Sequence, residues 1–234
     1  VRAARQMAEG RSFSARDLTE LHGSLATLDV ESGKHIQAKK LFKKSLEDPN
    51  DNAVAQAGWA SRHFSVPSIS NEIIQRTPNT FEASAWRNFN IGAWEAALEA
   101  TSSWANDEPF STFPAGHGSF LAISMLEDYD RGIEFANRGL VANPHAAGLA
   151  NNLVVGLAFK GELEKAQSIF LQYGLGSTGD VSNIATEGLL ASREGRTLDA
   201  IDLYERARDR AIAVGDPILY ARATFHFLME ALRW

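Results

Sequence analysis

A pattern that returns about every 34 residues is the feature that most constrains how this chain can fold. Small residues follow a Gly- or Asp-centred turn at five places, and the last four are spaced by 35, 34 and 34 residues: Ala38, Ala97, Gly132, Ala166 and Ala200. Self-similarity at this period is typical of an array of helix pairs. Such an array has no interior pocket where catalytic groups converge, and it offers instead a long curved surface for binding.

Helix signals dominate the rest of the sequence. Ser14 and Asp17 have the spacing of a capping box, and Asn79 and Glu82 repeat that spacing. Asp216 precedes Pro217, which suits the first position of a helix because its missing amide has no role there. No convincing alternating strand appears, so we predict an all-α fold.

The helices are expected in pairs. The predicted pairs are 14–31 with 34–47, 51–64 with 68–76, 79–91 with 93–105, 115–126 with 129–141, 145–160 with 162–173, and 180–194 with 197–213. We expect residues 1–13 to be the remnant of a preceding repeat in a longer protein, 14–215 to be the array, and 216–234 to be a C-terminal capping helix.

These residues resemble the tetratricopeptide repeat (TPR) family. Its unit has a Gly at the turn, then a small residue and an aromatic along the second helix. Three segments match this order: Gly161 to Ala166 with Phe170, Gly195 to Ala200 with Tyr204, and Gly33 to Ala38 with Phe42. A fourth, Gly92 to Ala97, matches in its glycine and its small residue. The resemblance implies a right-handed α-α superhelix of about six helix pairs plus a terminal helix.

The small residues have a physical role, because a large side chain at a tight helix crossing overpacks it at a cost of about 1–3 kcal/mol. The chain departs from the family pattern at Trp104 and Tyr173, which occupy late small positions, and at Phe120 and Val154, which occupy early ones. The second repeat is shortened around 65–68.

In TPR arrays the first helices of successive repeats line a concave groove. Carrying the family's inward-facing positions across predicts a partner-binding set: Trp59, Trp86, Phe89, Asn90, His117, Leu121, Asn151, Asn152, Val155 and Phe159. The resemblance extends this lining to Thr186, Leu189 and Arg193 and, on the last helix, to Tyr220, His226 and Phe227.

The predicted groove suits a peptide or a partner helix. Family members that clamp a terminal carboxylate place Lys, Asn and Arg at inward positions that here hold Glu82, His117 and Asn151, which argues against that specificity. Aromatic side chains remain as anchors and amides as backbone partners. The alternative is that the tryptophans and Phe89 pack in the core and that Asn151 and Asn152 have a solvated or helix-bonding role.

Composition narrows the function classes. The 23 Lys and Arg against 29 Asp and Glu give a net charge of −6, which argues against a nucleic-acid binder. Cysteine is absent, so disulfides and thiol nucleophiles are excluded. That absence fits the cytoplasm, and no apolar run predicts a membrane segment.

Three further motifs are weaker evidence for a functional site. Gly174 to Gly179 spells G-x-G-x-x-G but follows a predicted helix, so we interpret it as a linker and expect no cofactor. The lysines at 39, 40, 43 and 44 are interpreted as a solvated face. His226 and Glu230 have ligand spacing without a third ligand, so we expect no metal.

We therefore expect a non-catalytic scaffold that binds a peptide or protein. One alternative is a regulatory or ligand-sensing segment of a larger enzyme or transcription regulator. A third is an enzyme that uses His63, Glu82 and His117. The last helix carries an apolar stripe of Phe225, Leu228, Met229 and Leu232, which suggests a homodimer through that helix or the packing of a further segment.

Overall fold

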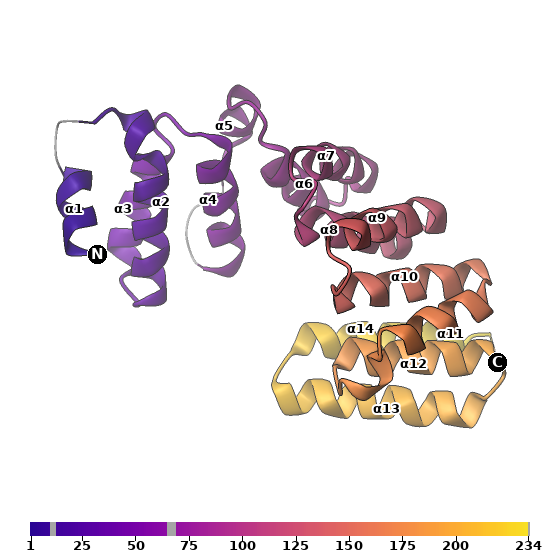
Figure 1. Ribbon diagram of the computed structural model, residues 1–234. Coiled ribbons are helices and arrows are strands. Elements are labelled where there is room, and N and C mark those ends of the chain that lie inside the picture. The colour runs from indigo at the N-terminus through magenta and orange to yellow at the C-terminus, as the bar shows by residue number, and fades with distance from the viewer. Residues whose placement is uncertain (10–12, 65–68, 234) are drawn as a thin grey trace. The chain divides into compact units, whose positions relative to one another are not determined.

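The computed structural model describes residues 1–9, 13–64 and 69–233, and these are all-helical (Figure 1). The described part contains fourteen α-helices, one short 3-10 helix and no strand. The helices are α1 (Arg2–Glu9), α2 (Ala15–Glu31), α3 (His35–Ser45), α4 (Asp51–His63), α5 (Asn71–Arg76), α6 (Phe81–Asn90), α7 (Trp94–Asp107), α8 (Thr112–Met125), α9 (Tyr129–Ala142), α10 (Ala147–Lys160), α11 (Leu163–Gln172), η1 (Leu175–Ser177), α12 (Val181–Arg193), α13 (Thr197–Val214) and α14 (Pro217–Ala231).

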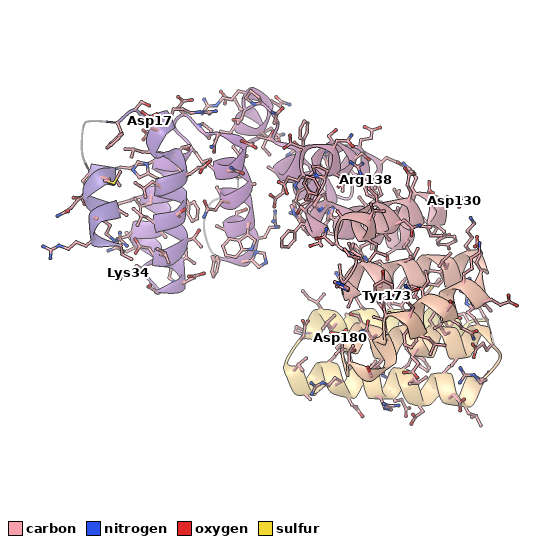
Figure 2. The ribbon with its side chains drawn as sticks, in the orientation of Figure 1. Asp17, Lys34, Asp130, Arg138, Tyr173 and Asp180 are labelled. Atoms are coloured by element: carbon pink, nitrogen blue, oxygen red, sulfur yellow. The ribbon has the colours of Figure 1, made fainter. Side chains whose placement is uncertain are left out.

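Two of the three predicted helix starts are confirmed. Ser14 and Asp17 form the reciprocal capping box, and Asp17 is labelled in Figure 2. Asp216 accepts hydrogen bonds from the amides of Ile218 and Leu219 ahead of α14. The predicted box at Asn79 is wrong, because Asn79 adopts a φ of 59° and the helix begins one residue later, after Thr80. The Thr80 hydroxyl donates instead to the carbonyl of Ile74 at 2.9 Å.

The predicted helix pairs match the observed ones closely. The largest difference is α8, which begins at Thr112 because the Ser111 hydroxyl accepts from the amide of Phe113 at 3.3 Å. The second repeat has the short α5, and the predicted start of that helix at residue 68 lies outside the described residues. The G-x-G-x-x-G segment holds η1 between two helices, which confirms that it is a linker.

The structure divides into two compact units, Val1–Trp104 and Ala105–Trp234, and each is described by itself. In the first unit α2 packs on α1, α3 and α4, and α4 packs on α6. A core cluster gathers Ala26, Val30, Ala38, Phe42, Ala57 and Ala60. Arg5 on α1 forms an ion pair with the buried Asp29 on α2, with a further bond of 3.1 Å between Nη1 and Oδ2.

The second unit stacks the remaining helices, α8 to α14. Successive first helices pack on one another, α8 on α10, α10 on α12 and α12 on α14, while α9 and α13 pair with α8 and α12. The main core cluster includes Leu149, Val154, Leu157, Ala166, Phe170 and Leu189. This arrangement places three consecutive first helices and α14 on one side of the unit.

The small residues lie at tight crossings, as predicted. Ala38, Ala97, Ala166 and Ala200 are 0% exposed. A Cβ on Gly132 would lie 2.4 Å from Cγ1 of Ile123, closer than real side chains approach. The spacing of the sequence pattern is therefore the spacing of helix contacts.

A candidate binding pocket in the second unit

A pocket opens on the side of the second unit where the first helices lie. It encloses a small cavity of about 100 Å³ within a wider depression that is open to solvent. We name it the apolar pocket and define it by its lining residues, which come from α8, α10, α12, α13 and α14: Phe120, Ile123, Ser124, Asn151, Asn152, Val155, Val181, Ser182, Ala185, Thr186, Leu189, Tyr204, Leu219, Arg222, Ala223 and His226.

The apolar pocket exists because α14 reaches back to earlier repeats. The guanidinium of Arg222 lies over the ring of Phe120 on α8, 4.6 Å from its centroid. His226 stacks on Phe159 of α10 with 6.1 Å between ring centroids. We expected an array to have no such enclosure. The difference arises because side chains of α14 contact helices two and three positions earlier in the stack.

A buried ion pair holds α14 in this position. Glu230 is 2% exposed and accepts hydrogen bonds at 2.8 Å from Nε and Nη2 of Arg193 on α12. The hydroxyl of Ser192 donates a third bond of 2.8 Å to the same carboxylate. These bonds attach Glu230 to α12, whereas His226, one turn earlier, stacks on Phe159 of α10.

Two buried polar groups of the apolar pocket have no hydrogen-bond partner among the described residues. They are Oδ1 of Asn151, whose residue is 8% exposed, and the hydroxyl of Tyr204, whose residue is 0% exposed. Burial raises the pKa of the Tyr204 phenol well above its ordinary value, and the nearby Glu230 adds to that effect. The phenol is therefore neutral and able both to donate and to accept a hydrogen bond.

His226 is the other titratable group on the pocket wall with a displaced pKa. Burial lowers the pKa of His226, Glu230 opposes the change, and Arg222 adds to it. The ring is therefore neutral at pH 7. Among the described residues no carboxylate lines the apolar pocket, and Arg222 is its charged residue.

A second, polar recess adjoins the apolar pocket and shares Asn151, Asn152 and Ser182 with it. The polar recess is further lined by Ala147, Gly148, Thr178, Asp180 and Asn183. Asp180, labelled in Figure 2, caps α12 by accepting from the amides of Ser182 and Asn183. The two asparagines thus line both depressions.

The structure brings four of the six predicted residues of the second unit to this region. Asn151, Asn152 and Val155 line the apolar pocket, and Phe159 contacts its wall through His226. The amide of Asn152 donates to Oγ of Ser119 at 2.8 Å, which fixes its orientation. His117 is 7% exposed and Leu121 is 0% exposed, so both lie in the core rather than on the accessible lining.

The other four predicted residues belong to the first unit. Trp59 packs edge-on against Phe64 at 5.4 Å between centroids, and Trp86 lies under the guanidinium of Arg62 at 4.6 Å. Phe89 packs between Trp86 and Trp94, and Asn90 is exposed. The three rings are half-buried in contacts with neighbouring side chains, as expected from the alternative that the tryptophans and Phe89 pack in the core.

The residues of the catalytic alternative are placed differently. His63 lies on Trp59 with Nδ1 2.9 Å from its carbonyl oxygen, and Glu82 is also in the first unit, whereas His117 is buried in the second. In the described ranges no three His, Asp or Glu side chains gather in a way that would hold a metal ion. No helix found there is both long and apolar enough to cross a membrane.

Sequence reasoning missed several lining residues. Phe120 was interpreted as a departure at a small position, and Tyr204 as the aromatic of the repeat pattern. Arg222 was not considered. One signal for Tyr204 was available, because Phe42 and Phe170 occupy the equivalent place four residues after the small residue. Among these three aromatic residues Tyr204 is the one that carries a hydroxyl.

Comparison with known proteins yields structural matches. No family model matches the chain, and no curated protein matches its sequence. A thermophilic TPR protein of Thermus thermophilus is similar in structure, with a TM-score of 0.53 at 16% identity over 90% of this chain and 99% of that one. The MamA protein matches with a TM-score of 0.48 at 15% identity over 83% of this chain and 92% of that one.

The chain therefore has a TPR-like, all-α solenoid fold, as the sequence resemblance implied. At these identities the similarity concerns the fold and leaves the function to be argued from the site.

Proposed function

We propose that this protein is a non-catalytic interaction module whose second unit binds a peptide segment of a partner protein. The observation that carries the proposal is the apolar pocket and the polar recess, joined by Asn151 and Asn152. An apolar depression next to amides and hydroxyls suits a peptide, because one side chain is buried while the backbone finds hydrogen-bond partners.

The charge of the site supports a neutral or weakly acidic segment. Arg222 is the charged residue of the lining, whose described residues include no carboxylate, and burial lowers the pKa of His226 and so favours its neutral form. Trp86 and Asn90 were expected to belong to the same groove. We retain the half-buried aromatic face of α4 and α6 as a separate candidate contact of the first unit.

A matched pair of valines tests the proposal. Val155 lines the apolar pocket, while Val141 on α9 is 87% exposed and absent from its lining. The full chain is used to select binders from a displayed library of random peptides. We expect Val155→Glu to weaken the binding of selected peptides at least about tenfold, since a bound peptide would have to remove water from the new carboxylate.

Val141→Glu should bind as the parent protein does. Circular dichroism and thermal melting of both variants show whether each remains folded. Recovery of no peptide, or equal binding by both valine variants in folded form, refutes the pocket as the peptide site.

We also propose that α14 allows two copies to associate. Phe225, Leu228 and Leu232 are 55%, 54% and 85% exposed, and Met229 is 39% exposed, which gives this helix a continuous apolar face. Trp234 lies outside the described residues. Sedimentation velocity of the parent and of Leu228→Lys tests the idea, and a parent that stays monomeric at high concentration contradicts it.

A further inference from the structure

We propose that the apolar pocket selects one kind of anchor: an aromatic side chain with a hydrogen-bond donor at its edge, tyrosine or tryptophan, in preference to phenylalanine or leucine. This inference rests on the proposed peptide binding and names the chemistry that the pocket recognises.

The walls favour an aromatic ring. Phe120 and His226 contribute aromatic rings to the lining, and Val155, Leu189 and Leu219 contribute aliphatic groups. Aromatic rings gain from offset or edge contacts with other rings beyond the burial of their area. An aliphatic anchor would lose that gain.

The two buried polar atoms without a partner favour an anchor whose ring carries a hydrogen-bond donor at its edge. Oδ1 of Asn151 accepts hydrogen bonds only, and the Tyr204 hydroxyl does either. A buried polar group without a partner destabilises the state that contains it, whereas a ligand atom that bonds to it removes that penalty. A phenol O–H or an indole N–H meets this need, and phenylalanine cannot.

The sequence pattern supports the same conclusion from a second direction. The positions equivalent to Tyr204 in two other repeats are Phe42 and Phe170, both buried among apolar side chains. Packing at this place is therefore satisfied by phenylalanine. The hydroxyl of Tyr204 adds a buried, unpartnered group that packing does not require.

Small-molecule probes test the pocket independently of any peptide. NMR spectra of the isotope-labelled full chain are titrated with p-cresol and with toluene, which differ by a hydroxyl, and with 3-methylindole and 1,3-dimethylindole, which differ in the indole N–H. We expect each donor-bearing member to shift resonances of Val155 and Leu189 and to bind at least about tenfold more tightly than its partner, the factor that one satisfied buried group supplies.

Variants then locate the selecting atoms. Tyr204→Phe keeps the ring and removes the hydroxyl, so it should reduce the preference for p-cresol over toluene to about threefold or less while leaving thermal stability equal or higher. Tyr220→Phe on α14 removes a hydroxyl outside the apolar pocket and should leave the preference unchanged. Asn151→Leu, which removes the amide, provides a second variant with the same expected loss if Tyr204→Phe fails to fold.

The outcomes separate the two proposals. Peptides from the display experiment that carry Phe or Leu as their invariant anchor, or equal affinity for the paired probes, overturn the selection of a donor-bearing ring while peptide binding stands. Probes that bind as expected without any selected peptide support the pocket chemistry and count against a peptide as its occupant. Enrichment of Tyr or Trp together with the probe preference supports both.

Discussion

Adding one methyl group at Gly132 tests whether tight helix crossings hold the second unit together. In Gly132→Ala the new Cβ would lie 2.4 Å from Cγ1 and 3.0 Å from Cδ1 of Ile123, and 3.3 Å from the carbonyl oxygen of Ser119. Ile123 is 3% exposed and can shift only toward the apolar pocket that it lines, whereas the backbone oxygen of Ser119 cannot rotate away. The methyl group should therefore displace the Ile123 side chain and push α9 away from the backbone of α8.

The expected magnitude follows from two opposed effects. Overpacking of a well-filled crossing costs about 1–3 kcal/mol. Replacing glycine by alanine inside a helix returns about 0.5–1 kcal/mol. We expect the free energy of unfolding to fall by about 1 kcal/mol, which lowers the melting temperature by about 2–4 °C for a chain of this size.

Gly148 supplies the matched control. It lies in α10, and a Cβ built there would meet no atom within 4 Å. Gly148→Ala should therefore keep or raise stability by up to about 1 kcal/mol. Thermal and urea denaturation of both variants, followed by circular dichroism, make the comparison. If Gly132→Ala is as stable as the parent or more so, the crossing tolerates a larger side chain and the packing argument is refuted.

Three further predictions follow from the same structure. Glu230→Ala leaves Arg193 without its carboxylate partner. Hydrogen exchange of the backbone amides of α14 should therefore show a loss of about 3 kcal/mol of protection. Unchanged exchange in α14 would contradict the role of the ion pair in holding this helix. Because burial lowers the pKa of His226, its neutral form stabilises the fold above pH 6.5, and that stability is lost as the pH falls below this value. Chemical denaturation should therefore show a lower free energy of unfolding at pH 5 than at pH 7, and His226→Phe should reduce this difference. An equal difference in the variant would refute the assignment. Leu121→Ala should lower the free energy of unfolding by about 2–5 kcal/mol, because Leu121 is fully buried. Asn90→Ala should change it by less than about 0.5 kcal/mol, because Asn90 is exposed. Denaturation curves with similar midpoints for the two variants would contradict this difference.

The fold was predictable because its main constraint is local and periodic. Ala166 and Ala200 mark helix crossings wherever the register places them. Ser14 and Asp216 mark helix starts because their side chains accept hydrogen bonds from backbone amides of the first helical turn. Asn79 shows the limit of this reasoning. Its side chain suits a cap, but its backbone adopts the left-handed region and Thr80 takes the position before the helix.

The pocket was only partly predictable, because it depends on contacts between distant repeats. Asn151 and Val155 were found through the family's inward-facing positions. Leu121 was assigned by the same rule and is fully buried, since neighbouring helices cover it. The 34-residue pattern of the sequence does not indicate that Arg222 contacts Phe120 or that Glu230 pairs with Arg193. Each pair joins side chains of different helices, and the distance between those helices depends on how the stack curves.

The way in which α14 is attached has a consequence for how its detachment would be detected. Its two fully buried side chains are Ala223 and Glu230, one a single methyl group and the other an acid. Release of this helix would hydrate a charged pair and would also uncover the apolar side chains of α12 and α13 beneath it, among them Val181, Ala207 and Ala211. Because the heat capacity of unfolding depends mainly on exposed hydrocarbon, a calorimeter would detect the opening of this end of the stack through the faces that α14 covers rather than through α14's own buried side chains.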